Sequence, residues 1–380
     1  MTILQAIHNQ QTKVLVSLPL AVALWHGGFF AGAHYLFAAL ALVALVVCRP
    51  RPLPRDLVWV ALVVIAVANV LAALEAGRRD TLPATLTACA MPALYPIAVR
   101  LGADADLWLL KAVTALAAAS AVAGIVAYAT HRGPDAESID GIWRAGGPFE
   151  YPPALALLCV CGIAATMALA ASADLGWPSA AALMLLFGGS LVLTFDRASE
   201  VWAVVVVAVF TLRLRVLRRL LPALATGLVV GAVVVAVSPP SATALADHLQ
   251  HGLISSRTGV WSDAWRGVRT RPGLGYGPGG FVRIYRHVDD PTETGLAHNL
   301  PLEQAVEAGV VAGVAAAVLL VVMFARSARC LMTRDPVLLG WGAIAGVTAL
   351  TSLYDFTWSF PPLALLGLIA AARCRQRPSQ

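Results

Sequence analysis

A histidine and two carboxylates stand at the start of an apolar run. His298 and Asn299 come just before Pro301, which suits the first turn of a helix because proline lacks the N–H that would be unpaired there. Glu303 and Glu307 are four residues apart, so they share a helix face. The positive end of a helix dipole favours a neutral, basic imidazole and attracts anions. The stretch predicts a site for proton transfer or anion binding. Its structural alternative is a loop histidine beside a helix cap, with both carboxylates at the membrane interface.

Arginines supply the cationic groups of a candidate site. Arg197 stands in a short polar connection, and Arg144 stands beside a Gly-Gly turn. A guanidinium remains charged and offers a planar fork that matches phosphate oxygens. The ordinary alternatives are an interfacial anchor for Arg197 and a simple return turn at Arg144.

A third arginine, Arg257, begins an amphipathic segment after the potential capping residues Ser255 and Ser256. The apolar residues recur at spacings of three and four, which predicts a helix of about four turns. They are Val260, Trp261, Ala264, Trp265 and Val268. Residues 273–280 follow, with five glycines that exclude regular helix. Their G-x-G-x-x-G spacing does not indicate a nucleotide site, because no strand precedes it and no helix follows it.

The composition places these segments on a membrane scaffold. Hydrophobic residues make up 59% of the chain and charged residues 13%, whereas soluble domains carry about 25% charged residues. We therefore expect an all-α integral membrane protein with about 12 transmembrane helices. The apolar runs lie at 13–29, 31–48, 57–76, 83–100, 106–128, 153–172, 177–195, 200–213, 219–238, 301–325, 336–357 and 361–373. The first is interpreted as an uncleaved span, and Gly309 and Gly313 predict close approach of another helix.

The arginines orient this scaffold. Most follow spans two, four, eight, ten and twelve, so the positive-inside rule places both termini in the cytoplasm, with Arg78 and Arg79 as exceptions. The net charge of +6 then reflects membrane topology rather than nucleic-acid binding. Residues 129–152 and 239–300 fall outside. We divide the chain into helices one to nine at 1–238, a periplasmic loop at 239–300, and helices ten to twelve with the tail at 301–380.

Four short motifs resemble those of the O-antigen ligase family, whose relatives are O-antigen polymerases and protein O-oligosaccharyltransferases. They are Leu193-Thr-Phe-Asp-Arg-Ala-Ser-Glu-Val-Trp202, Arg257-Thr-Gly-Val-Trp261, Pro272-Gly-Leu-Gly-Tyr-Gly-Pro-Gly-Gly-Phe281, and His298-Asn299 followed by nine residues and Gly309. The resemblance is sharp from about 190 to 313. The ligase pattern has Gly, Thr or Val where this chain has Ala312, which leaves ligase and polymerase open.

The resemblance implies a fold like that of C-type glycosyltransferases and a metal-independent, inverting glycan transfer without a cofactor. The donor would be a glycan on undecaprenyl pyrophosphate, and the acceptor the lipid A–core oligosaccharide at the periplasmic face of the inner membrane. In this chain we expect Arg197 and Arg257 to clamp the pyrophosphate, and His298 to act as the base. Substrate contacts are expected from Arg144, Asn299, Arg266, Tyr276 and Glu303.

Two other functions compete. A transporter of the same lipid-linked glycan would also use arginines, but the basic and histidine residues gather on one face, and no matching pair of broken helices is evident. A metal site at His248 and His251 has a plausible spacing, but no nearby cluster completes it. In-vitro transfer with purified substrates separates an enzyme from a transporter.

Overall fold

The computed structural model describes residues 13–375, except 15, 54, 140–141, 238–256 and 285–294. The helices are α2 (Ala31–Cys48), α3 (Leu57–Ala76), α4 (Leu82–Arg100), α5 (Asp104–Thr130), α6 (Pro152–Ala171), α7 (Trp177–Thr194), α8 (Arg197–Arg213), α9 (Leu221–Val237), α11 (Arg257–Thr270), α12 (Leu300–Ala308), α13 (Val310–Leu331), α14 (Pro336–Thr351) and α15 (Pro361–Arg373). Strands β1 (Ala136–Ile139) and β2 (Ile142–Ala145) form an antiparallel hairpin. The prediction of an all-α membrane protein is confirmed, with this hairpin as a small exception.

Eight helices of the described chain are long and apolar enough to cross a membrane, and α14 and α15 are shorter apolar helices. Three expected runs differ from the structure. The first is interrupted by 3-10 turns at Val22–Leu24 and His26–Gly28. The run 301–325 is divided into α12 and α13 at Gly309, and the run 336–357 ends at Thr351. The last two differences matter for function, because both place polar backbone at the site described below.

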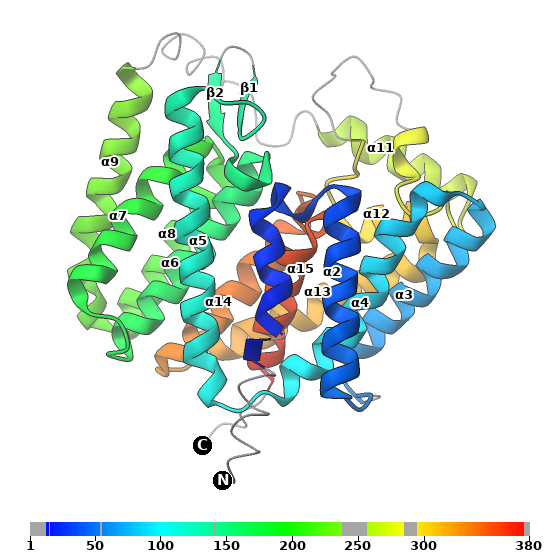
Figure 1. Cartoon of the computed structure of the whole chain (residues 1–380), viewed down its shortest axis with the longest axis horizontal. Helices are drawn as coiled ribbons and strands as arrows, with labels where there is room; N and C mark the ends of the chain where they lie inside the picture. Colours follow the sequence, from blue (N-terminus) through cyan, green and yellow to red (C-terminus); the bar gives the residue numbers. More distant parts are fainter. Residues whose placement is uncertain are drawn as a thin grey trace.

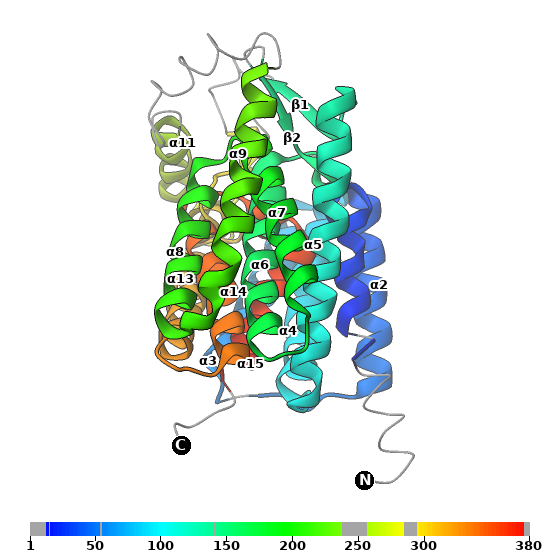
Figure 2. The same ribbon diagram turned by 90° about the vertical axis from the view of Figure 1, so that its left-hand side faces the viewer.

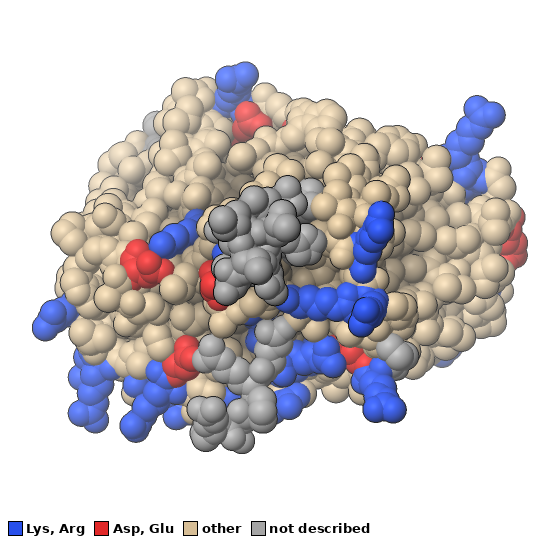
Figure 3. Space-filling view, turned by 60° about the horizontal axis from the view of Figure 1, so that its bottom comes forward, with Lys and Arg blue, Asp and Glu red and all other residues tan. Residues whose placement is uncertain are grey.

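The helices form one bundle around α6, which is almost entirely buried and packs against α5, α7, α8 and α14. The first and last described parts of the chain lie at the same end of the bundle, and the β-hairpin and α11 lie at the opposite end (Figures 1 and 2). Lys and Arg side chains gather on the end that carries the termini (Figure 3). The described parts of the two candidate outer segments therefore share one end, as the arginine pattern predicts. We call this end the α11 end.

The break between α12 and α13 accommodates the glycine-rich loop that follows α11. Gly309 has φ +90° and ψ 167°, a conformation that is essentially restricted to glycine. The loop docks on the break through hydrogen bonds from Val310 N to Pro272 O (2.9 Å) and from Gly277 N to the backbone oxygen of Glu307 (2.9 Å). Gly313 packs against Ala305 of α12. Gly309 therefore allows the glycine-rich loop to approach α13, and Gly313 allows α12, the preceding helix, to pack closely.

Replacing Gly309 with alanine should lower the free energy of unfolding by at least about 2 kcal/mol, since it combines backbone strain with overpacking. The added Cβ would lie 1.7 Å from the backbone oxygen of Gly273. Thermal unfolding in detergent measures the loss. Gly273→Ala is the matched control, because its Cβ would meet no atom within 4 Å. Equal unfolding midpoints for the two variants would contradict this account of the break.

Candidate functional site

The connection between α14 and α15 carries a buried carboxylate. Asp355 is the only charged residue between Pro336 and Ala372, and it is 2% exposed. Its Oδ1 accepts a hydrogen bond from its neighbour Phe356 N (2.7 Å). The hydroxyl of Tyr151, just before α6, donates to the same carboxylate at 3.0 and 3.1 Å. These donors partly offset the cost of burying a charge.

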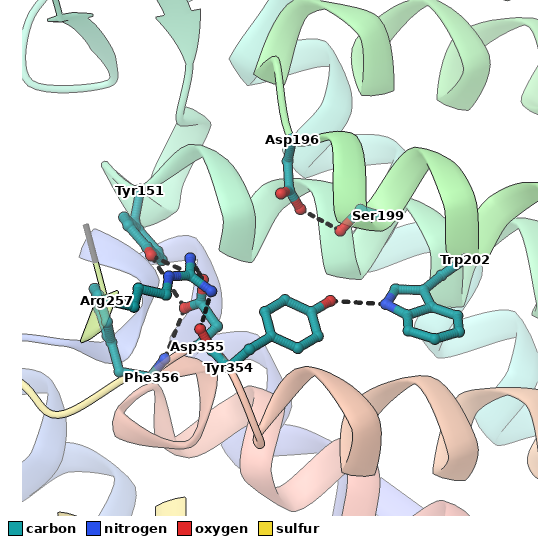
Figure 4. A network of polar contacts seen from close by, with 8 residues as sticks. All are labelled: Tyr151, Asp196, Ser199, Trp202, Arg257, Tyr354, Asp355 and Phe356. Carbon is teal, nitrogen blue, oxygen red and sulfur yellow. Dashed lines mark hydrogen bonds and ion pairs between the residues drawn. The ribbon is translucent and has the colours of Figure 1, made fainter. Parts of the chain in front are cut away.

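Arg257, the first residue of α11, completes the ion pair (Figure 4). Its Nη2 lies 3.4 Å from Asp355 Oδ2, and its Nη1 donates to the backbone oxygen of Tyr354. The guanidinium also lies over the ring of Tyr354, 5.5 Å from the centroid. The side chain of Arg257 remains 21% exposed. Part of the guanidinium fork therefore stays accessible while the rest is held in place.

A second group of polar side chains approaches from α7 and α8 (Figure 4). The hydroxyl of Ser199 donates to the carboxylate of Asp196, and Trp202 Nε1 donates to the hydroxyl of Tyr354 at 2.7 Å. Arg144 of β2 donates from Nε to the backbone oxygen of Thr194 (3.0 Å), where α7 ends. Charges on Arg144 and Arg257 both act on Asp196. The charges of the two groups of polar side chains therefore interact, and we call the two groups together the polar cluster.

His298 lies beside the polar cluster, in the turn before α12. Its backbone is left-handed, with φ 49°, and its ring packs edge-on against Phe356 with centroids 4.7 Å apart. Burial and, to a smaller extent, the positive charge of Arg257 together lower the pKa of His298 to about 3. Within the described residues, the buried Nδ1 of His298 has no hydrogen-bond partner. The ring is therefore neutral, with a nitrogen that a substrate hydroxyl can satisfy.

The turn that carries His298 is tied to the α14–α15 connection. Asn299 caps α12 by accepting from Leu302 N (2.9 Å), and its amide nitrogen donates to Leu353 O (2.8 Å). Leu300 N donates to Ser352 O at 2.8 Å. The buried carboxylate of Glu303 accepts from Ser359 Oγ (3.3 Å) and from the backbone of Ala297. Asn299 and Glu303 thus hold His298 beside Asp355.

Not every expected site residue reaches this cluster. Arg197 begins α8 next to Asp196, and its charge acts on Glu200. Arg266 lies on the outward face of α11 and pairs with Asp263 at 2.8 Å. Tyr276 packs its ring in the small core beneath α11. The structure therefore brings together Arg257, His298, Asn299, Glu303 and Arg144, with Arg197 next to Asp196, and leaves Arg266 and Tyr276 apart.

Sequence reasoning missed Asp355, Tyr151 and the Tyr354–Trp202 pair. Asp355 had a usable signal, because a single charge within two apolar runs is costly and tends to be functional. The expected span 336–357 concealed it by placing Asp355 inside a helix. Tyr151 and Trp202 carry no comparable signal, since aromatic residues at span ends are common interfacial anchors.

The proposed metal ligands His248 and His251, and the capping residues Ser255 and Ser256, lie outside the described residues. Among the residues that the structure describes, no group of three His, Cys, Asp or Glu side chains is placed to hold a metal ion. The charged and titratable side chains of the described site are Arg144 and Arg257, the neutral His298 and buried carboxylates.

Comparison with known proteins identifies one protein family. A family model described as O-antigen ligase matches residues 181–317, which include α8, α11, the glycine-rich loop, α12 and the start of α13. No curated protein matches the chain. The matched segment contains Arg197, Arg257 and His298, whereas Tyr151 and Asp355 lie outside it on either side.

Proposed function

We propose that this chain is an O-antigen ligase, because residues 181–317 match the family model described as O-antigen ligase. It transfers a glycan from undecaprenyl pyrophosphate to the lipid A–core oligosaccharide at the periplasmic face of the bacterial inner membrane. The observation that carries the proposal is that Arg257 and a neutral His298 contact adjacent residues of the α14–α15 connection, Asp355 and Phe356. The guanidinium of Arg257 can bind a pyrophosphate, and the neutral imidazole of His298 can accept a hydroxyl proton.

Arg257 is assigned to the leaving pyrophosphate. Asp355 and the backbone oxygen of Tyr354 hold one edge of its guanidinium, which reduces the conformational entropy lost when phosphate oxygens bind the remaining N–H groups. A cation fixed beforehand stabilises the negative charge that grows on the leaving group. Arg197, at the start of α8, is proposed as the second clamp residue, and Arg144 as a contact near the same carboxylate, Asp196.

His298 is assigned to the acceptor. Its neutral imidazole accepts the hydroxyl proton while the hydroxyl oxygen attacks the anomeric carbon. The bond from that carbon to the pyrophosphate oxygen breaks, and its electron pair leaves with the pyrophosphate. Attack opposite the leaving group inverts the anomeric centre. Neither a metal nor a nucleotide takes part in this balance.

A polymerase of the same family is the second candidate function. The observation that favours it is Ala312, which replaces the Gly, Thr or Val of the ligase pattern and is completely buried in α13. A polymerase would use the same arginine and histidine but would accept a lipid-linked glycan instead of the lipid A–core. The two enzymes therefore differ in the acceptor and not in the chemistry.

Transfer with purified components tests the proposal. The protein in nanodiscs is mixed with a lipid-linked glycan and either purified lipid A–core or a second lipid-linked glycan, with EDTA present. We expect a glycan–lipid A–core product. Extension of the lipid-linked glycan alone would identify a polymerase, and movement of the donor across the bilayer without any new linkage would identify a transporter.

The pH dependence should report Asp355 rather than His298. Burial raises the pKa of Asp355 to about 7, although the charge of Arg257 opposes the rise. As the pH falls through about 7, Asp355 becomes protonated and its ion pair with Arg257 weakens, so transfer should decline. His298, with a pKa of about 3, stays neutral throughout this range. Rates measured between about pH 5 and 9 should show this decline.

Asp355→Asn should give a low and nearly pH-independent rate, because the variant permanently lacks the negative charge. Asp80→Asn is the control, since Asp80 is an exposed carboxylate that pairs with Arg78 and Arg283. The transfer rate of Asp80→Asn should fall with pH as it does in the unmodified protein. An unchanged decline in Asp355→Asn would assign the titration to another group.

A further inference from the structure

Helix α11 presents two different faces. Val260, Ala264 and Val268 are buried against Ala305 and Val306 of α12 and against Phe281. The opposite face is exposed and forms one stripe along the helix. Its residues are Thr258, Ser262, Trp265, Arg266, Arg269 and Thr270. Trp265 is 52% exposed. The apolar face of α11 is thus already covered by protein, and the outward face combines an aromatic ring with cations.

Two arginines of this surface lie over aromatic rings. The guanidinium of Arg269 is 5.4 Å from the centroid of Trp265, and that of Arg271 is 4.9 Å from the centroid of Tyr276. Neither Arg269 nor Arg271 has an ion pair with a described acidic residue, whereas Arg266 is paired with Asp263. An arginine stacked on a ring keeps its N–H edge free for an anion. We call the exposed residues Trp265, Arg269 and Arg271 the α11 outer surface.

The loop after α11 rests on the end of a membrane span. A Cβ at Gly277 would lie 2.8 Å from the Cβ of Ala76, the last residue of α3. Arg283 pairs with Asp80, in the turn between α3 and α4, at 3.2 Å. Figure 1 shows α11 at the end of the bundle where that turn lies. The α11 outer surface therefore lies near the level where lipid headgroups surround the spans.

We propose that the α11 outer surface binds the phosphate groups of anionic phospholipids in the adjacent leaflet. Tryptophan is enriched at the membrane interface, where its ring tolerates both apolar and polar neighbours. Arginine recognises phosphate through its planar fork and attracts an anionic surface. The positive charge of the α11 outer surface complements a lipid phosphate. Its position at the end of the spans places it at headgroup level rather than in the hydrocarbon core.

This contact links the lipid surface to the site. Arg257 is the first residue of α11, whereas Arg269 and Arg271 lie at the opposite end of the helix and just after it. A bound headgroup holds that end of the helix against the membrane and so restricts the placement of Arg257. The binding itself does not depend on the proposed reaction, so it is measured without glycan transfer.

The test uses the protein in nanodiscs of phosphatidylcholine with 30% phosphatidylglycerol, roughly the share that gives a strongly anionic surface. A phosphatidylglycerol with a photoactivatable headgroup is included, and crosslinked peptides are identified by mass spectrometry. We expect crosslinks on the peptide that spans 258–276. The double variant Arg269→Gln with Arg271→Gln should lose most of them. About 1 kcal/mol per arginine corresponds to about fivefold each in binding, or about 25-fold together.

Two matched variants make the test specific. Arg269→Lys with Arg271→Lys keeps both charges and should retain most of the crosslink. Arg329→Gln with Arg334→Gln removes the same charge near the connection between α13 and α14, and it should leave the α11 crosslink unchanged. Loss in the lysine variant equal to that in the glutamine variant would overturn the proposal. So would equal crosslinking by a phosphatidylcholine analogue.

A different occupant would also be visible. If no crosslink forms on α11 and the glutamine variant instead raises the KM for the lipid A–core acceptor, the surface serves the acceptor, and the lipid proposal falls. Unchanged thermal unfolding of the glutamine variant shows that the fold is intact, as expected for two exposed side chains.

Discussion

His298→Ala should abolish glycan transfer while the protein still binds its lipid-linked donor. A general base typically contributes about 10²–10⁴-fold to a rate, and the His298 ring packs against Phe356, the neighbour of Asp355. Donor binding should survive, because Arg257 is held by Asp355 and Tyr354 rather than by His298. Single-turnover transfer and donor binding are measured in parallel.

Two further variants sharpen this result. His298→Gln keeps a side chain of similar length in the buried position, and it should be as inactive as the alanine variant if the proton is what matters. His131→Ala removes a histidine that is exposed and stacks on Trp143, and it should transfer normally. Loss of donor binding in proportion to transfer would make His298 a substrate contact, and the base would then be sought at Glu303 or Glu307.

Arg257→Ala should reduce transfer by about 10²–10³-fold, the loss typical when one preorganised donor to a developing negative charge is removed. Unlike His298→Ala, it should also weaken donor binding, because the guanidinium meets the pyrophosphate before and during the reaction. Arg257→Lys should recover only part of the rate, since an ammonium cannot make a two-point contact. The measurements are donor affinity and single-turnover rate in nanodiscs.

The chain offers an internal control for Arg257. Arg266 lies on the same helix but faces outward and pairs with Asp263, so Arg266→Ala should keep near-normal transfer. Arg257→Ala also leaves Asp355 buried without its cation, which can destabilise the fold. The double variant Arg257→Ala with Asp355→Asn removes that unpaired charge. It should restore the unfolding midpoint without restoring transfer. Near-normal transfer by Arg257→Ala would remove Arg257 from the proposed clamp.

The scaffold was predictable from the sequence because long apolar runs have few alternatives in a membrane. The bounds of α2 and α3 agree with the expected runs 31–48 and 57–76. The breaks were not predictable in the same way. Hydropathy averages over windows, so it carried the expected spans through Gly309 and through Asp355, where the structure ends helices.

The site was predictable as a set of residue types but not as a constellation. Arg257, His298 and Asn299 stand near recognisable helix starts, which made them visible in the sequence. Asp355 belongs to the same cluster, yet it is 98 residues beyond Arg257 and 204 beyond its partner Tyr151; that separation is bridged only by the packing of the bundle. Arg266 and Tyr276 were expected at the site from proximity along the chain, but helical periodicity turns Arg266 outward and the glycine-rich loop carries Tyr276 into the core beneath α11.

Much of the cluster is fastened through main-chain carbonyl oxygens. Arg257 donates to the backbone oxygen of Tyr354, and the amide of Asn299 donates to that of Leu353. The backbone N–H of Leu300 donates to the backbone oxygen of Ser352. A carbonyl oxygen is present whatever side chain its residue carries. Position 353, whose side chain is 43% exposed, should therefore accept many amino acids in a saturation mutagenesis screen, whereas the buried positions 352 and 355 should not. The side chain at position 353 can accordingly vary while its backbone oxygen keeps Asn299, and with it the turn of His298, in place.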